Sequence, residues 1–489
     1  MRTLILIVAL IGALLVATTA SAGVRDNDDT CDVKVGPAAT LLLPYFEVDI
    51  FGNSGRTTLF TITNVTRYPQ VAHVTLWTDW AFPVLTFNLY LTGYGVQSID
   101  LADVIKRGVV AAPDAGAARG SLSSSSNDQL RPDNGCDSLF RIPANVAAAV
   151  RSALTVGTYN PGGGVGACTG VGGVHYNAIG YATVDVVSNC TSRFPSDPLY
   201  YSNDLLYDNV LIGDYQQIGP MPAGTSLAGF EAGGNPMVHI RAVPEGGAAG
   251  TEVATNLPYT FYDRYTPQGA RTIDRRQPLP STFAARFIQG GPSAFATNLT
   301  IWREGFGSGT CATVGANATL LVPELVGFDE RENLLGYRPP DIQPYFSGPV
   351  TLPATSATST TNSFVYPILT GTDLGGWLYL NLNNGGSPTY STQTNLSPTG
   401  STTTFGLRPS QNWVTVTMFG TLGTNRLAAE YDAAPLGNGC SPAAFISTAN
   451  SKTGKPIGPA GGVFVCPPGP TLTNGTTAQC TGTNANPPP

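Results

Sequence analysis

Residues 35–44 read VGPAATLLLP, and residues 314–323 read VGANATLLVP. Seven of the ten positions are identical, and an eighth exchanges Leu43 for Val322. Short apolar runs of this kind, bounded by turn-forming residues, are typical of buried β-strands. We therefore predict that each segment opens one copy of an internal repeat. In the first copy, Pro44 is expected to stop the strand that starts at Thr40.

Eight cysteines accompany this repeat. Cys31 and Cys311 lie just before the two copies, and Asn-Gly-Cys closes each copy, at Cys136 and Cys440. An even number of cysteines in an exported chain favours disulfide bonds. A zinc site is the alternative, but no C-x-x-C motif occurs and the chain has only three histidines, so we expect no metal and no cofactor. The predicted bonds are Cys31–Cys136, Cys311–Cys440, Cys168–Cys190 and Cys466–Cys480.

Alternating apolar residues predict further strands around the repeat. Segments 56–63 and 85–91 alternate, as in a strand with one buried face. In the first, Thr58, Phe60 and Ile62 form the less polar row, and in the second the apolar residues occupy every second position. Segments 282–289 and 296–302, on either side of Gly290-Gly291-Pro292, are expected to form a β-hairpin. The remaining strands are predicted at 71–78, 179–187, 209–212, 237–243, 363–369, 376–382, 413–419 and 462–465.

Two short helices are predicted in the N-terminal half. Asp100 suits the N-cap of a helix over 101–107, and Gly108 suits its C-terminal cap. The segment 143–155 reads PANVAAAVRSALT and is followed by Gly157, which predicts a second helix. The Gly-rich stretch after it lacks the Lys-Ser/Thr ending of a phosphate-binding loop.

These patterns predict a mostly β, disulfide-bonded chain made of two related β-sandwich-like domains with long loops. The first domain is expected at 23–275, with loop and helix insertions, and the second at 276–446. Residues 447–489 are expected to form a Gly-, Pro- and Thr-rich tail with a small disulfide loop. Residues 1–22 have a basic start, an apolar run and the small-residue ending Ala20-Ser21-Ala22, which predicts a cleaved signal peptide and a secreted or periplasmic protein. We expect no membrane-spanning segment after cleavage.

The composition narrows the range of partners. Charged residues make up only 12% of the chain, and the net charge is −7. Nucleic-acid binding needs clustered Lys and Arg, so we do not expect a nucleic-acid partner. An extracellular glycan or another protein is the remaining expectation.

No catalytic motif occurs in the chain. The histidines, His73, His175 and His239, are predicted to be structural, because no G-x-S-x-G or H-E-x-x-H motif accompanies them. A carboxylate pair of the kind that hydrolyses glycosides can be neither located nor excluded among 32 acidic residues. The acidic segment 26–32 has oxygens for Ca²⁺ but lacks the glycine and distal glutamate of an EF-hand, which favours a solvated leader.

Trp77, Asp79 and Trp80 form the most suggestive binding constellation. Two indole rings could stack on a sugar while the carboxylate takes hydrogen bonds from its hydroxyl groups. In a strand, however, Trp77 and Asp79 share one face and Trp80 points away, which favours a core position for Trp77. The stretch 259–276, rich in Tyr and Arg, is either a binding surface or an interdomain linker held by Arg–Asp pairs.

The function expected from these features is that of an exported, non-enzymatic structural or binding protein. The alternatives are a glycan-binding or carbohydrate-active protein and a subunit of an extracellular assembly that pairs through strand edges. β-Sandwich domains host many functions, so the fold class does not choose among these three.

Overall fold

The computed structural model describes ten stretches of the chain, apart from isolated positions inside them. They are residues 35–110, 142–219, 235–242, 276–303, 319–320, 324–338, 343–344, 349–352, 375–382 and 412–436. Within these stretches the protein is mostly β, and the strands form several antiparallel sheets. The predicted mostly β class is therefore confirmed. The predicted strands at 363–369 and 462–465 lie outside the described residues.

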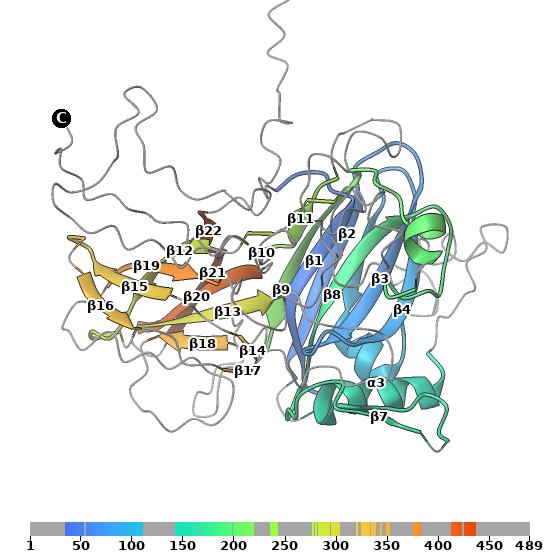
Figure 1. The fold of residues 1–489 in the computed structure, drawn as a ribbon, viewed down its shortest axis with the longest axis horizontal. Coiled ribbons are helices and arrows are strands. Elements are labelled where there is room, and N and C mark those ends of the chain that lie inside the picture. Colours follow the sequence, from blue (N-terminus) through green and yellow to red (C-terminus); the bar gives the residue numbers. More distant parts are fainter. Residues whose placement is uncertain are drawn as a thin grey trace, which may run out of the picture.

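Two sheets, the N-terminal sheets, are built from the described residues up to Ile240 (Figure 1). The five-stranded sheet has the order β11-β1-β8-β3-β4, and the four-stranded sheet has the order β10-β9-β2-β5. Their strands are β1 (Thr40–Val48), β2 (Thr57–Asn64), β3 (Gln70–Thr78), β4 (Pro83–Leu91), β5 (Val96–Asp100), β8 (Ala178–Val187), β9 (Leu211–Ile218), β10 (Asn235–Pro236) and β11 (Val238–Ile240).

Two more sheets, the C-terminal sheets, follow in the second half of the chain, with the orders β16-β15-β19-β12-β22 and β18-β13-β20-β21. Their strands are β12 (Thr282–Ile288), β13 (Ala296–Arg303), β15 (Glu324–Asp329), β16 (Leu334–Arg338), β18 (Pro349–Leu352), β19 (Gly375–Asn381), β20 (Asn412–Leu422), β21 (Asn425–Asp432) and β22 (Ala434–Pro435). Two small ribbons pair β6 (Thr158–Tyr159) with β7 (Cys168–Thr169) and β14 (Thr319–Leu320) with β17 (Gln343–Pro344).

Both predicted helices are present. Asp100 Oδ1 accepts a hydrogen bond from the Ala102 N–H (2.8 Å) at the start of the first, which continues as the π-helical turn η2 (Asp103–Arg107). Gly108 ends it with a φ of 68°. Helix α3 (Ala144–Val156) ends at Gly157, whose φ is 66°, and it lies at the lower end of the N-terminal sheets in Figure 1. Such left-handed backbone at a helix end favours glycine. A further π-helical turn, η5 (Tyr200–Asp204), has no counterpart in the sequence prediction.

Pro44 does not stop the first strand, so this prediction is wrong. β1 continues to Val48, and its register against β8 shifts between Leu43 and Phe46. Proline has no N–H to donate to a strand ladder and is tolerated where the pairing is irregular. The strand therefore passes through Pro44 at an irregularity in the ladder.

The predicted hairpin of segments 282–289 and 296–302 is also wrong. Both strands exist, as β12 and β13, but β12 pairs with β19 and β22, whereas β13 pairs with β18 and β20. A single bridge joins Gly290 to Phe295 at the turn between them. The turn therefore carries the chain from one C-terminal sheet to the other. Turn residues identify the reversal, but they do not choose the partner of each strand.

The two N-terminal sheets enclose one hydrophobic core. In β2 the inward side chains, among them Phe60 and Ile62, alternate with partly exposed ones. They meet Leu41 and Leu43 of β1 and Val184 of β8 within the same cluster. This is the pattern expected of a sheet with one covered face.

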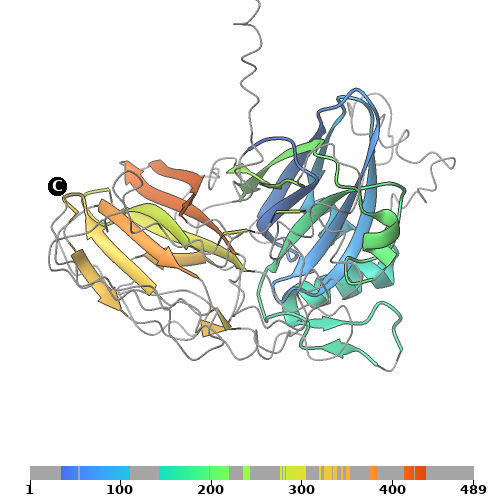
Figure 2. The same ribbon diagram turned by 45° about the horizontal axis from the view of Figure 1, so that its top comes forward.

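A second core covers the opposite face of the five-stranded sheet. Leu42, Trp77 and Tyr181 from this sheet belong to one cluster with Trp302 and Phe283 from the C-terminal sheets. The Tyr181 ring meets the edge of the Trp302 ring, with centroids 5.7 Å apart. Figures 1 and 2 show the C-terminal sheets beside the N-terminal ones in both views. The five-stranded sheet is thus covered on both faces.

Arg276 fastens the start of the second half of the chain to this sheet. Its side chain is fully buried, and its Nη1 lies 3.0 Å from Asp185 Oδ1. The hydroxyl groups of Thr40 (2.5 Å) and Tyr200 (2.6 Å) donate to the same carboxylate. This part of the 259–276 stretch therefore makes the Arg–Asp pair expected of a linker, while residues 259–275 lie outside the described residues.

No helix among the described residues is long and apolar enough to span a membrane.

Candidate functional site

Trp77 and Trp80, the two aromatic residues of the predicted sugar platform, are not exposed side by side. Trp77 is fully buried and stacks on Tyr181, with the rings 5.6 Å apart and 3° from parallel. Its Nε1–H donates to Thr183 Oγ1 at 2.9 Å. Trp80 is half-buried against the core between the N-terminal sheets. Trp77 therefore has no face left for a ligand.

Asp79, the third predicted residue, pairs with a histidine that the sequence did not place beside it. Asp79 Oδ2 contacts His175 Nε2, and Asp79 Oδ1 accepts the Gly173 N–H at 2.9 Å. Asp79 and His175 side chains are 2% and 10% exposed. The His175 N–H also donates to the Thr155 carbonyl (2.7 Å) near the end of α3. The pair thus anchors the loop 172–177 to α3 and to the end of β3.

Gly173 lies directly over this pair. A Cβ added there would lie 2.6 Å from His175 Nε2 and 2.7 Å from Asp79 Oδ2, closer than real Cβ contacts. The backbone can therefore pass this close to the Asp79–His175 pair only because residue 173 has no side chain. Catalysis by such a pair requires a reacting group within hydrogen-bonding reach. The close approach of the Gly173 backbone favours instead a role in positioning the loop 172–177.

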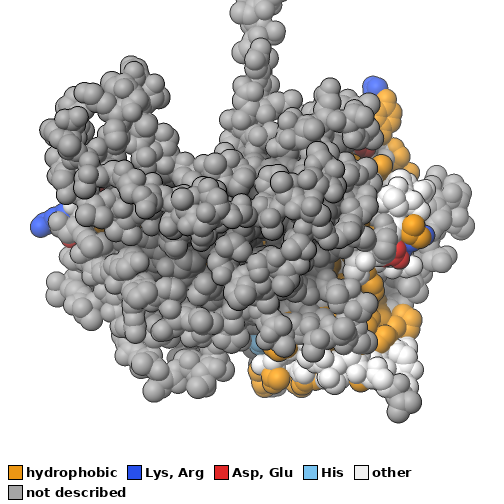
Figure 3. Space-filling model, in the orientation of Figure 1, with side chains coloured by type: hydrophobic (Ala, Val, Ile, Leu, Met, Phe, Trp, Pro, Cys, Tyr) orange, Lys and Arg blue, Asp and Glu red, His pale blue; other side chains and the backbone are white. Residues whose placement is uncertain are grey.

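The same loop exposes an aromatic residue. Tyr176 is 62% exposed, and its ring lies 5.2 Å from that of Phe51, which is 60% exposed, at a tilt of 42°. Val174 and Val156 beside it are 81% and 53% exposed. We call these four residues the end patch. Figure 3 shows hydrophobic side chains at the lower edge of the molecule, next to a histidine.

Two of the segments that carry the end patch are bonded to each other. The backbone bonds from His175 to Thr155 and from Val171 to Gly157 (3.1 Å) place Val174 alongside Val156. Val174 and Tyr176 are two positions apart and flank the anchored His175.

Phe51 belongs to a loop whose shape is set by Asp49. The Asp49 carboxylate accepts hydrogen bonds from the N–H groups of Phe51 (2.9 Å), Gly52 (2.9 Å) and Gly55 (3.0 Å). A short polar side chain that gathers several N–H groups in this way fixes a turn. Phe51 is therefore held in position before any ligand arrives.

Polar side chains lie next to the patch. Glu47 contacts Arg56 at 2.6 Å and accepts a hydrogen bond from Asn177 Nδ2 at 2.6 Å. Asn177 directly follows Tyr176. The patch therefore combines an exposed aromatic pair with ordered hydrogen-bonding groups.

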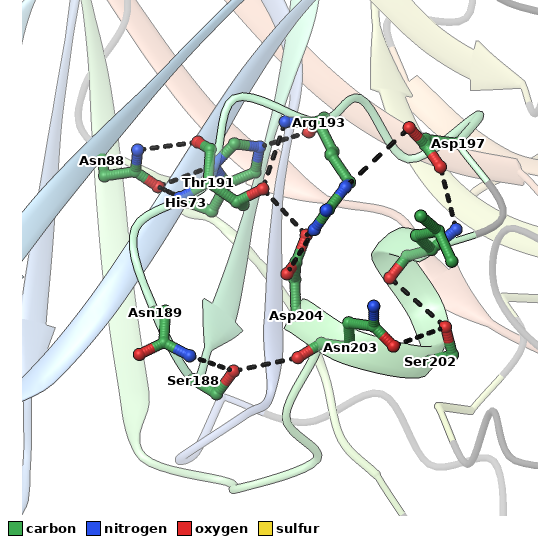
Figure 4. A network of polar contacts seen from close by, with 11 residues as sticks. His73, Asn88, Ser188, Asn189, Thr191, Arg193, Asp197, Ser202, Asn203 and Asp204 are labelled. Atoms are coloured by element: carbon green, nitrogen blue, oxygen red, sulfur yellow. Dashed lines mark hydrogen bonds and ion pairs between the residues drawn. The ribbon is translucent and has the colours of Figure 1, made fainter. Parts of the chain in front are cut away.

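The other two histidines are buried in structural positions. His73 Nδ1 lies 2.9 Å from Asn88 Oδ1, and its Nε2 lies 3.1 Å from the Arg193 carbonyl oxygen. Burial lowers the pKa of His73. Arg193 in turn pairs with Asp204 at 2.9 Å, and Figure 4 shows how this network holds the loop after β8 against β3 and β4.

His239 accepts the Gly213 N–H at Nε2 (3.1 Å), and burial lowers its pKa as well. Among the described residues, no three His, Cys, Asp or Glu side chains gather where a metal could bind.

Cys168 and Cys190 are the two cysteines in the described residues, and neither is free. Cys168 lies in β7, and Cys190 follows the end of β8. Both are disulfide-bonded, and their predicted pairing with each other stays a prediction. The other six cysteines and the acidic segment 26–32 lie outside the described residues.

Sequence reasoning missed Phe51, Val174 and Tyr176. Their signal is a large apolar residue inside a loop of glycine and asparagine, FGNSG at 51–55 and GGVHYN at 172–177. No family model matches the chain, and neither a curated protein nor a solved structure shows significant similarity to it. Function must therefore be inferred from the geometry of the described residues.

Proposed function

We propose that this chain is an exported, non-enzymatic binding protein whose ligand site is the end patch. The observation that carries the proposal is the ring contact between Phe51 and Tyr176, both about three-fifths exposed. Contiguous apolar surface on a soluble protein marks an interaction site more often than an isolated exposed residue does. The anchoring of both loops, by Asp49 and by the Asp79–His175 pair, supports a preformed site.

A glycan is the ligand class that this site fits best. Two aromatic faces at a tilt of 42° offer apolar surface to the C–H groups of a sugar ring. Glu47, Arg56 and Asn177 provide hydrogen-bonding groups for hydroxyls at the side of the patch. A site of this kind recognises the shape of a sugar and the orientation of its hydroxyl groups, and it needs no reacting group.

The non-enzymatic part of the proposal rests on the position of the Asp79–His175 pair. The pair is sealed beneath Gly173, and its hydrogen bonds run to backbone groups of the loop and of α3. Its chemistry is therefore used to hold the loop that carries Tyr176.

The proposal includes two related β-sandwich-like domains, at 23–275 and 276–446, outside the cytoplasm. The sheet orders support the relationship, since a five-stranded and a four-stranded sheet occur in each half. The repeated segments at 35–44 and 314–323 support it independently, and the sequence of residues 1–22 supports export.

The test is a sedimentation assay of the mature protein with insoluble polysaccharides and cell-wall material. Tyr176→Ala removes one ring of the pair. Tyr94→Ala is the matched control, because Tyr94 is similarly exposed (69%, against 62% for Tyr176) in the β4–β5 turn at the opposite end of the N-terminal sheets. We expect at least tenfold weaker binding for Tyr176→Ala and no change for Tyr94→Ala, and soluble oligosaccharides should compete.

Two results would overturn the glycan assignment. One is equal binding by both variants and the wild type, and the other is no binding to any polysaccharide. Light scattering on the same samples tests the assembly alternative: association that Tyr176→Ala abolishes would make a second copy of the chain the occupant of the patch.

A further inference from the structure

A second polar cluster joins the C-terminal to the N-terminal sheets. It lies where the edge strand β21 meets β9 and β10. Tyr215 of β9 donates its hydroxyl hydrogen to Glu430 Oε1 of β21 at 3.0 Å. Asn235 of β10 donates to Asp432 Oδ1 of β21 at 3.2 Å. We call these four residues the joint cluster.

The two carboxyl groups of the joint cluster share one face of β21, because they are two positions apart in a strand. Asp432 Oδ1 also accepts the Nε1–H of Trp413 at 2.9 Å from the neighbouring strand β20. Glu430 Oε2 is buried and has no hydrogen-bond partner.

The groups that face the two carboxyls are almost all neutral. They come from β9 (Tyr215), β10 (Asn235) and β20 (Trp413 and Thr415), and on β21 itself each carboxyl group faces the other. Among the described residues, no Lys, Arg or His side chain forms an ion pair with either one. The buried carboxylate of Asp185 differs from these two, because Arg276 supplies an opposite charge beside it.

Two ionised carboxylates in such a place are unfavourable, because each loses hydration and repels the other. Burial, with repulsion from Asp432, raises the pKa of Glu430 to about 7. Burial raises the pKa of Asp432 to about 6, against the hydrogen bonds it receives. The pKa of Tyr215 lies well above its usual value, mainly because it is buried, so it remains a donor.

We propose that the joint cluster is a proton-dependent lock, in which protonation of Glu430 and Asp432 holds the C-terminal sheets against the N-terminal sheets and loss of these protons loosens the contact. The folded chain then binds more protons than the unfolded chain between the ordinary carboxyl pKa and the raised one. Stability is therefore fully present in acid and is lost as the pH rises through about 6 to 7. An exported protein with this lock is most rigid in mildly acidic surroundings.

The test is equilibrium unfolding of the mature chain in urea, from about pH 5 to about pH 8. For each carboxyl that stays protonated only in the folded state, the unfolding constant should rise up to about tenfold per pH unit. The double variant Glu430→Gln with Asp432→Asn keeps the joint cluster neutral at every pH. Its unfolding constant should therefore change much less with pH than that of the wild type. Glu330→Gln is the control, because Glu330 is half-exposed and paired with Arg286 in the C-terminal sheets.

An unchanged pH slope in the double variant would overturn the proposal, as would a wild-type stability that rises over this range. If the double variant does not fold, Glu430→Gln alone carries the same test. Small-angle scattering of the wild type at both ends of the range gives a second readout. A larger radius of gyration at high pH supports the lock, and identical profiles with a flat unfolding curve refute it.

Discussion

The two N-terminal sheets have similar strands but different surroundings. In the four-stranded sheet, β2 alternates strictly between buried and partly exposed side chains. In the five-stranded sheet, β1, β3 and β8 are buried at nearly every position on both faces. One face packs on the four-stranded sheet and the other on the C-terminal sheets. A strand of the four-stranded sheet therefore has one face that accepts polar side chains at little cost. A strand of the five-stranded sheet has no such face.

This difference decides what happens to polar residues. In β2 and β9, polar side chains such as Thr61 and Asp214 face outward. In the five-stranded sheet, His73 and Asp185 are fully buried and depend on protein partners. Buried polar groups without partners are costly. Substitutions at matched positions in the two sheets should therefore differ strongly.

The largest difference is expected for the two aspartates. Asp185→Ala leaves the Arg276 guanidinium buried without its counter-charge, which costs about 3–5 kcal/mol of folding free energy. Asp214→Ala removes an exposed side chain of β9 and should stay within about 0.5 kcal/mol. Urea unfolding measures both values. Similar losses for the two variants would show that the five-stranded sheet does not depend on this buried pair.

A comparable loss is expected at Trp77. Trp77→Ala opens a cavity between the five-stranded sheet and the C-terminal sheets and should cost about 3–5 kcal/mol. Val96→Ala in β5 is the control, because Val96 is 49% exposed and should change little. Thermal unfolding followed by circular dichroism separates them. A mild effect of Trp77→Ala would mean that the two sheet pairs unfold independently.

The smallest effect has the opposite sign. Thr75 is fully buried in β3, and its hydroxyl has no hydrogen-bond partner. Thr75→Val keeps the shape and removes this unpaired group, which should stabilise the protein by about 1 kcal/mol. Thr61→Val, on the outer face of β2, should be close to neutral. Destabilisation by Thr75→Val, measured by urea unfolding, would indicate that its hydroxyl is satisfied.

The sequence predicted local features well and long-range ones poorly. The strands β2, β3, β4 and β8 and the helix ending at Gly157 lie where periodicity and capping placed them. Pro44 was misjudged, because an irregular ladder tolerates a residue that a regular one excludes. The turn at Gly290 was recognised, but its two strands entered different sheets.

The candidate site also shows that local features were predicted better than long-range contacts. Trp77 was the most prominent aromatic residue in the sequence, and it is core because a second sheet covers its face. Asp79 was suggestive by composition, yet its partner His175 lies 96 positions away. Phe51 and Tyr176 gave weak signals in separate loops, and only the fold brings their rings together.

By itself the sequence determined the mostly β class, the positions of many strands and both helix caps, because alternation and capping depend on neighbours a few residues away. Only the tertiary structure decided which faces are covered, which charges are paired and which aromatic rings remain exposed. Thr40 and Asp185 are 145 positions apart, and Tyr215 and Glu430 are 215 apart. Contacts over such separations depend on how whole sheets pack, and no local pattern in the chain records that.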